Sequence, residues 1–392
     1  MYTTTRDAIL PTTVTGSWPR PRWMSENLSG ELFSGKLSDV RFREQFVDGV
    51  TTIISDQEMA GLDILTNGDY HQDDTLGGGS WTIYPLERLG GVSSEHPQRS
   101  WMTSPAHPPG TILHEVMSGV VYPTVVDAIT DGVPLEYDKI WRIAQARSVR
   151  PVKFGTASAQ SIAMAAPLRT ERYAKDKRQL IWDIATVQNA ELRKLAEAGC
   201  KAIQIEEPLI HMVAATANDK DFLDFLVEAF NHEVAGLDDV EIWIHTCWGN
   251  PAMQRIQDAV SYENSLELYL DRLHGDVWTV EWKNNGQQTL KLLEKYRDNL
   301  PKKVALGLID HRTLQVESAQ EVAADIRTIL ESVDPRNVVL SSNCGFGHQG
   351  ANRLITNYKA ASLAQGANIV REELGYPTTP VRSASPQLQI DV

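Results

Sequence analysis

Short runs of apolar and β-branched residues recur along this chain, and most of them are followed by a segment with the apolar period of a helix. Eight such runs lie at residues 9–17, 62–69, 151–158, 201–208, 241–247, 277–282, 304–310 and 337–344. Continuous apolar strands that alternate with helices are typical of parallel sheets covered on both faces. Eight strand–helix units therefore predict an α/β protein with the (β/α)8, or TIM, barrel fold.

Two of the intervening segments show helical patterns most plainly. Residues 178–199 keep a 3.6-residue apolar period and close on Gly199, a common helix stop. Residues 318–333 begin with Ser318 and have Glu321 three positions later, the pattern of a capping box. The alternative fold is an open doubly wound sheet, but no GxGxxG motif follows the first run to support it.

One stretch does not fit the strand–helix period. Residues 70–150, between the second and third runs, are much longer than a usual βα connection, and long connections are commonly functional. We expect an insertion over the barrel mouth, with strands that form a hairpin and a helix at 137–149. Residues 1–392 are then predicted to form a single barrel domain that contains this insertion.

Composition narrows the class of protein. Three cysteines are too few, and odd in number, for a disulfide framework, which favours a reducing, cytoplasmic location. A formal charge of −14 argues against a nucleic-acid partner. No apolar run approaches the ~20 residues that span a bilayer, and the first residues lack the pattern of a signal peptide, so no membrane partner is expected. An enzyme is the favoured class.

The predicted strand ends carry an imidazole, two thiols and several carboxylates, and a barrel directs such residues into one pocket. His245 and Cys247 are two residues apart, so their side chains share one face of a strand. Zn2+ accepts nitrogen, sulfur and oxygen ligands at ~2.0–2.3 Å in a tetrahedron. The sequence therefore predicts a zinc cofactor held by four strand-end residues: His245, Cys247, Glu281 and Cys344. A buried cysteine is otherwise a small apolar residue, and Cys200 is interpreted in that way.

Such a ligand set has a chemical consequence. Two thiolates and a carboxylate more than neutralise Zn2+, which makes the ion a poor Lewis acid for hydrolysis but a good holder of a thiolate. A free thiol has a pKa near ~8.5, and coordination deprotonates it at neutral pH. Because the thiolate is the nucleophile, the residues predict that a small thiol is alkylated by an alkyl donor.

Several motifs resemble the catalytic C-terminal domain of cobalamin-independent methionine synthase and its single-domain relatives, over roughly residues 8–370. In chain order they are TVTGSWPR (13–20), LTNGDY (65–70), IQIEEP (203–208), WIHTC (243–247), VEW (280–282), LGLIDHRTLQVE (306–317) and SNCG (342–345). The resemblance implies a barrel with catalytic zinc on the same four residues. It also implies methyl transfer from a methyl-folate or other donor to homocysteine or a related thiol.

The resemblance also implies contacts to the substrate. Ser17 would contact the substrate carboxylate, and Asp69 and Glu206 would hold its amino group, although the lengths of these two acids are exchanged relative to the usual family pattern. The usual Asp-x-His after the seventh strand is here Asp310-His311-Arg312, which displaces or removes the family's proton donor.

The predicted substrate contacts are completed by two further strand-end acids and one candidate proton donor: Glu207, Asp310 and His348. The folate segment after the third strand has no Trp here, so no residue is assigned to the methyl donor.

Two alternatives stay open at this point. A thiol addition or carbon–sulfur lyase reaction, as in the epoxyalkane:coenzyme M transferases of the same family, would be favoured if Arg20 and Arg22 lined the pocket to hold a sulfonate. A non-catalytic protein that binds zinc or a small thiol is the alternative from another class.

Overall fold

Seven parallel strands form the central sheet in a computed structural model that describes residues 3–26, 28, 31–72, 80–99, 108–118, 120–217, 219–256, 261–284, 286–347 and 351–385. The strands, in their order across the sheet, are β1 (Leu65–Thr66), β4 (Val152–Ala157), β5 (Ala202–Glu206), β6 (Glu241–Thr246), β7 (Val277–Glu281), β8 (Lys303–Ile309) and β9 (Val338–Ser342). Each strand pairs in parallel with the next. Seven of the eight predicted strands are thus present as regular strands.

The eighth position of the barrel is filled by residues 10–18, which make one isolated parallel bridge, between Thr12 and Leu340. On one side the Leu340 N–H donates to Pro11 O at 2.8 Å, and on the other the Ile64 N–H donates to Thr12 O at 3.0 Å. The segment therefore lies between β9 and the residues that lead into β1, and it closes the ring.

This first run was predicted to be a strand and is instead an extended segment with few ladder bonds. Pro11 has no N–H to give to a ladder, and Leu10 adopts a φ of 50°, outside the range of a strand. The fold is nevertheless the predicted (β/α)8 barrel with a long insertion after the second strand position.

Alternate residues of the strands face the barrel interior and the surrounding helices. Six buried side chains form an inner cluster: Ile64, Ala202, Trp243, Val277, Ala305 and Val339. Residues of the other parity, such as Ile203 and Ile244, belong to the large core beneath the helices. Because inward positions recur every second residue, His245 follows Trp243, and Glu281 follows Val277, on the inner face toward the carboxyl ends of the strands.

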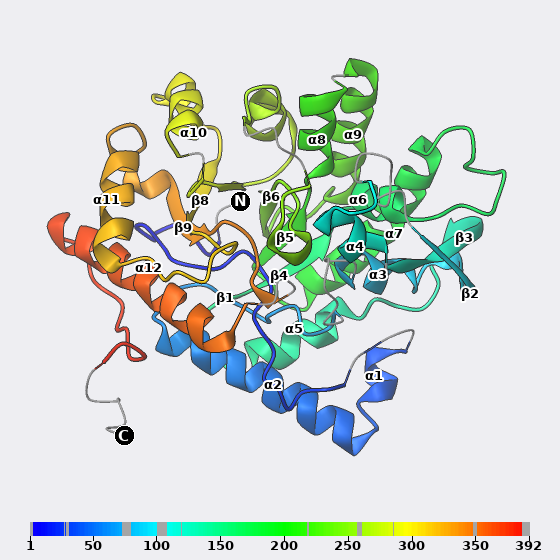
Figure 1. The fold of residues 1–392 in the computed structure, drawn as a ribbon, viewed down its shortest axis with the longest axis horizontal. Coiled ribbons are helices and arrows are strands. Elements are labelled where there is room, and N and C mark those ends of the chain that lie inside the picture. Colours follow the sequence, from blue (N-terminus) through cyan, green and yellow to red (C-terminus); the bar gives the residue numbers. More distant parts are fainter. Residues whose placement is uncertain are drawn as a thin grey trace.

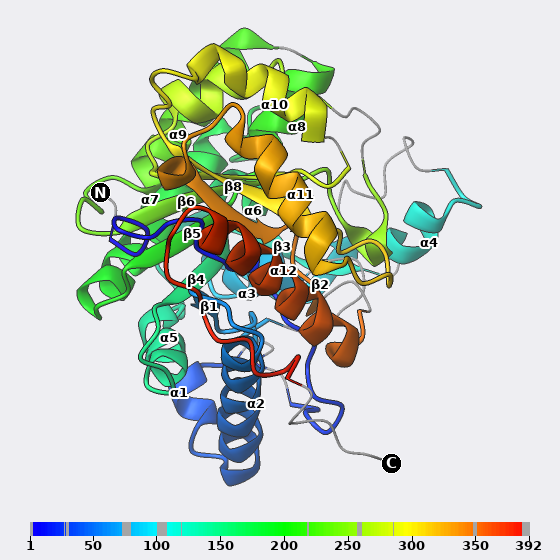
Figure 2. The same ribbon diagram turned by 90° about the vertical axis from the view of Figure 1, so that its left-hand side faces the viewer.

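Helices surround the sheet (Figure 1), and Figure 2 shows α11 and α12 side by side against the last strands. The α-helices of the described residues are α1 (Phe33–Lys36), α2 (Val40–Met59), α3 (Ser80–Leu86), α4 (Ile112–Ser118), α5 (Tyr137–Gln145), α6 (Ala159–Ala165), α7 (Arg178–Glu197), α8 (Leu209–Thr216), α9 (Lys220–Glu233), α10 (Gly286–Leu293), α11 (Ala319–Leu330) and α12 (Arg353–Glu373). The predicted capping box at Ser318 and Glu321 is confirmed at the start of α11. Helix α7 ends just before Gly199, whose φ of 106° suits a residue without a Cβ.

The insertion contains the expected antiparallel strand pair, β2 (Gly90–Arg99) and β3 (Val121–Thr130). The helix expected at 137–149 is α5, which ends earlier, at Gln145. Strand β3 lies along the segment after α6, where the Val125 N–H donates to Pro167 O at 2.9 Å and Val125 O accepts from the Arg169 N–H at 2.9 Å. The strand pair is therefore attached to the connection that follows β4, and it appears beside α6 and α7 in Figure 1.

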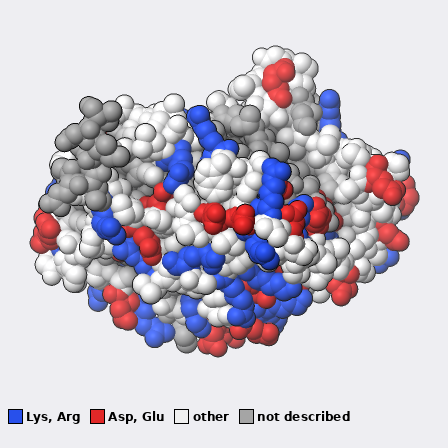
Figure 3. Space-filling view, turned by 90° about the horizontal axis from the view of Figure 1, so that it is seen from below, with Lys and Arg blue, Asp and Glu red and all other residues white. Residues whose placement is uncertain are grey.

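Charged side chains of both signs are interspersed on the face shown in Figure 3, which is the face over α2 and its neighbours. The sequence as a whole is acidic, with a formal charge of −14. No helix in the described part of the chain is both long enough and apolar enough to cross a bilayer.

Candidate metal and substrate site

A histidine and two cysteines meet at the carboxyl ends of the strands. His245 lies near the end of β6, Cys247 follows that strand, and Cys344 follows β9. Their ligand atoms, one imidazole nitrogen and two sulfurs, all lie within 4.8 Å of one another. Strands β7 and β8 separate β6 from β9 in the sheet, so it is the curl of the barrel that brings the three side chains together.

The surroundings of these groups fit a metal ion. His245 is fully buried, and neither ring nitrogen makes a hydrogen bond of ordinary geometry to a described residue. Its Nε2 lies 3.5 Å from Glu206 Oε2. The Cys344 thiol is the other polar partner of this imidazole, and a nitrogen and two sulfurs at one point are a donor set that Zn2+ takes.

The two thiols interact directly. A hydrogen bond between them holds the pKa of Cys344 well below its usual range and raises the pKa of Cys247 well above it. The hydrogen bond thus favours ionisation of the Cys344 thiol over that of Cys247, and the thiolate is the form that binds a metal.

Glu281, the predicted fourth ligand, ends β7 and is fully buried. Its carboxylate is bound by the Arg312 guanidinium, with Nη1 2.5 Å from Oε2 and Nη2 2.6 Å from Oε1. The Trp248 N–H also donates to Oε1, at 3.3 Å. The close group of three ligand atoms does not include Glu281, and its role as a zinc ligand stays a prediction.

Two acids lie beside the cluster. Burial, and then the charge of Glu206, raises the pKa of Asp69 to about 8. Burial also raises the pKa of Glu206, and Cys344 acts in the same direction on both acids. The sequence predicted both acids as contacts to an amino group, and a pair of partly exposed carboxylates at the barrel mouth is suited to receive a cation.

Below these acids the barrel interior contains a lysine that sequence reasoning missed. Lys153 donates to Gln204 Oε1, and Gln204 Nε2 donates to Glu206 Oε1. The Lys153 ammonium lies 4.3 Å from the centre of the Trp243 ring, and burial lowers its pKa to about 7. Both Lys153 and Gln204 lie on the predicted strands at the inward parity, which is the signal that would have found them.

The other predicted substrate contacts bond to the protein's own backbone. Ser17 is buried, and its Oγ accepts from Gly347 N at 3.0 Å, in the loop that carries Cys344. Glu207 accepts from Ile210 N at 2.9 Å at the start of α8, and burial raises its pKa to about 7.

Asp310 closes its own turn, because its Oδ1 accepts from Arg312 N at 2.9 Å. His348 lies outside the described residues. Sequence reasoning also assigned no role to His311, which is buried and whose ring nitrogens make no hydrogen bond to a described residue.

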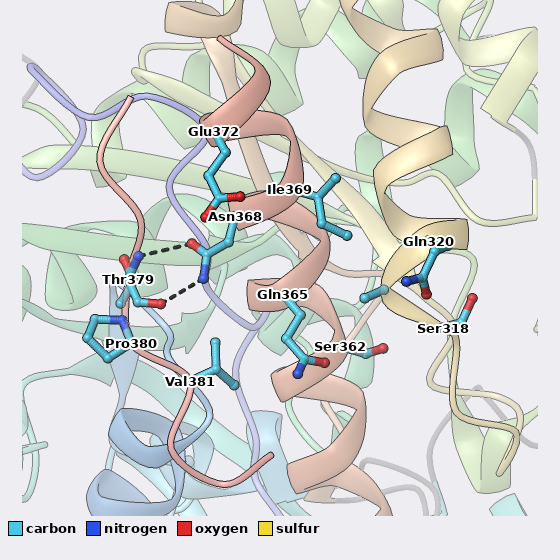
Figure 4. A pocket seen from close by; sticks show the side chains of 11 residues that line it. Ser318, Gln320, Ser362, Gln365, Asn368, Ile369, Glu372, Thr379, Pro380 and Val381 are labelled. Atoms are coloured by element: carbon cyan, nitrogen blue, oxygen red, sulfur yellow. Dashed lines mark hydrogen bonds between the residues drawn. The ribbon is translucent and has the colours of Figure 1, made fainter. Parts of the chain in front are cut away.

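A separate cavity of about 690 Å³ lies between α11, α12 and residues 379–381 (Figure 4). Amides and hydroxyls dominate its lining, and Asn368 pairs with Thr379 through two hydrogen bonds along one side. No predicted site residue that the structure describes lines it, so the strand-end cluster remains the candidate active site.

A (β/α)8 barrel with titratable and metal-binding side chains at its strand ends has the active-site arrangement of barrel enzymes. Residues 10–365 match the family described as cobalamin-independent synthase, catalytic domain, and the chain belongs to this family of thiol methyltransferases. It is therefore a methyltransferase.

Relatives and solved structures agree with this assignment. The chain is 31% identical to the methionine synthase of Sulfurisphaera tokodaii over 379 residues, which cover 95% of this chain and 97% of the relative. It is 30% identical to the methionine synthase of Saccharolobus solfataricus, with 93% and 96% covered. Its fold is similar to that of a B12-independent methionine synthase from Shewanella sp. W3-18-1 in complex with selenomethionine, with a TM-score of 0.75, 24% identity, and 94% and 99% of the two chains covered.

Proposed function

We propose that this enzyme is a zinc-dependent methyltransferase that methylates homocysteine or a related small aminothiol. The single observation that carries the proposal is the group formed by His245, Cys247 and Cys344, whose ligand atoms lie within 4.8 Å of one another. The names of the relatives, all methionine synthases, support the choice of thiol.

His245, Cys247 and Cys344 would hold the ion, and Glu281, the fourth ligand predicted from the sequence, ends the neighbouring strand β7. Bound zinc would keep the substrate thiol deprotonated, as a thiolate, at neutral pH. In the reaction the sulfur–methyl bond forms while the bond from methyl to the donor breaks. The electron pair of the broken bond stays on the donor, which then takes a proton.

The protein's own acids would select the thiol. Asp69 and Glu206 lie beside the cluster, and Glu206 Oε2 is 3.5 Å from His245 Nε2. An ammonium group placed between the two carboxylates would stabilise their ionised forms, since an opposite charge offsets the cost of burial. Ser17, anchored to the loop of Cys344, is proposed to contact the substrate carboxylate.

The alternative of a sulfonate-bearing thiol gains no support from the arginines that would favour it. Arg20 donates to the carbonyl oxygens of Glu26 and Tyr70, at 3.4 and 3.3 Å, and Arg22 is exposed. Methyl-folate is proposed as the first donor to test, and other methylated small molecules as the next.

The test combines metal analysis with a methyl-transfer assay. We expect one zinc per chain and formation of methionine from homocysteine and methyl-folate or another methyl donor. Cys247→Ser and Cys344→Ser should each lose the metal and the activity. Cys200→Ser is the control, because that thiol is buried away from the cluster and donates to Ala202 O at 3.3 Å.

Full zinc occupancy in Cys247→Ser would show that the metal site is assigned to the wrong residues. A zinc-loaded protein that methylates no thiol with any donor would favour the non-catalytic binding protein.

A further inference from the structure

The pairing of Glu281 with Arg312 has a consequence for any metal bound beside it. The Glu281 side chain is 0% exposed and that of Arg312 is 10% exposed, so the pair is removed from water. Two parallel N–H···O bonds, of 2.5 and 2.6 Å, join them. Bidentate contacts between guanidinium and carboxylate are among the stronger hydrogen bonds in proteins, and this one occupies both carboxylate oxygens.

Arg312 is itself held in place through its side chain and through its backbone. Arg312 Nη2 donates to Gly249 O at 3.0 Å, in the loop that carries Cys247. At the other end, the Arg312 N–H donates to Asp310 Oδ1 at 2.9 Å in the turn after β8. Arg312 is therefore a fixed partner for Glu281, built into the same strand-end layer as the cluster of His245 and the cysteines.

The net charge of the site determines whether Glu281 binds more strongly to the metal or to Arg312. Zn2+ with two thiolates and a neutral imidazole has no net charge, and a carboxylate ligand would make the complex an anion in a buried place. The charge of the Glu281 carboxylate is already balanced by Arg312, so this carboxylate gains less free energy from binding a metal. A bound ion and Arg312 would thus compete for one carboxylate.

We propose that Arg312 is a positioning residue that competes with the metal for Glu281, so that His245, Cys247 and Cys344 carry most of the zinc affinity and the fourth position is open to the substrate thiol. This inference rests on the proposed zinc-dependent function. It differs from a purely structural ion pair, because it predicts that loss of Arg312 strengthens metal binding.

The experiment measures zinc affinity by competition with a chelator, in the absence of substrates. Arg312→Gln should free Glu281 and raise the affinity about tenfold or more, and X-ray absorption should then show an added oxygen ligand. Glu281→Gln in the otherwise native protein should change the affinity less than about threefold. The same change in the Arg312→Gln background should remove the gain.

A matched control is Arg353→Gln, since Arg353 holds Asp56 by two bonds, of 2.6 and 2.7 Å, outside the cluster. Its zinc affinity should equal that of the native protein. If Arg312→Gln does not fold, Glu281→Gln alone decides, because a tenfold or greater loss of zinc there would overturn the inference. Unchanged or weaker zinc binding in a folded Arg312→Gln protein would also overturn it. A native protein that binds no zinc would instead reject the proposed function.

Discussion

The carboxyl group of Asp69 lies in a turn where its own backbone has a φ of 56°. Asn adopts this left-handed conformation readily, so Asp69→Asn should fold and keep its zinc. The substitution should nevertheless weaken the binding of an aminothiol roughly ten- to a hundredfold. A charge-assisted contact is worth ~1.5–3 kcal/mol, and a tenfold change in affinity corresponds to ~1.4 kcal/mol. Titration calorimetry with homocysteine measures the loss.

An amine-free thiol of similar size is the control for this change, and its affinity should fall much less. Equal losses for both thiols would mean that Asp69 only shapes its turn. They would also move the substrate toward a thiol without an amino group.

Individual site residues differ in how far the sequence could predict them. Residue type and strand position alone were enough to predict that His245, Cys247 and Cys344 lie together. The chain has only three cysteines, so two of them at predicted strand ends are a distinctive signal. Arg312 and its pairing with Glu281 could not be predicted, since the partners are 31 positions apart and meet only after β7 and β8 align.

At the scale of elements, the presence of strands and helices was predicted more accurately than the residues at which they begin and end. Seven of the eight apolar runs became regular strands because both faces of those runs are buried. The first run shows the limit of this reasoning, since Pro11 and the positive φ of Leu10 interrupt a ladder that the apolar pattern alone would predict. Helix α5 ends at Gln145, whose side chain holds the non-helical residues that follow by donating to Ser148 O and Arg150 O at 3.1 and 2.9 Å.

The end of α9 provides a prediction about pH. Glu233 is buried there and accepts from Ala159 N, at the start of α6, at 3.1 Å. Burial raises its pKa from 4.5 to about 8. Between these values the unfolded chain ionises this group while the folded protein keeps it protonated, so stability falls as the pH rises through this window.

Glu233→Gln keeps the acceptor for Ala159 and removes the ionisation. Relative to the native protein its midpoint of thermal unfolding should be similar at pH 5 and higher by about 2 °C or more at pH 8. Glu373→Gln is the control and should give no such gain, because the hydrogen bond from Arg327 lowers the pKa of Glu373. A difference that is the same at both pH values would contradict this account.

At the scale of the whole molecule, closure of the barrel depends on contacts between parts of the chain that are far apart in sequence. Residues 10–18 join β9 to the approach of β1, and the segment after α12 returns to the same place, where Arg382 N donates to Met59 O at 2.8 Å. The site depends on this closure because Ser17 belongs to the first segment and Cys344 to the last strand connection.

Asp63 is the residue at which these parts meet. Its carboxylate pairs with Arg371 of α12 at 2.5 Å and accepts from Thr379 at 2.7 Å and from Thr12 N at 2.9 Å. Burial alone would raise the pKa of Asp63, but the charge of Arg371 and these hydrogen bonds lower it below 3.8. Its contribution to stability is therefore present above pH 3.8 and is lost as the pH falls below that value.

Asp63→Asn should reduce the free energy of unfolding at pH 7 by about 1.5–3 kcal/mol, the worth of hydrogen bonds to a charged group. Urea unfolding at pH 7 and pH 3 measures the effect, which should shrink at the lower pH. Asp224→Asn is the control, since both side chains of its pair with Arg272, at 2.6 Å, are more than a third exposed and such pairs contribute little. Zinc content should be unchanged in both variants, because neither side chain lies near the cluster. An equal loss of stability in the two variants would mean that Asp63 does not join the ends of the barrel.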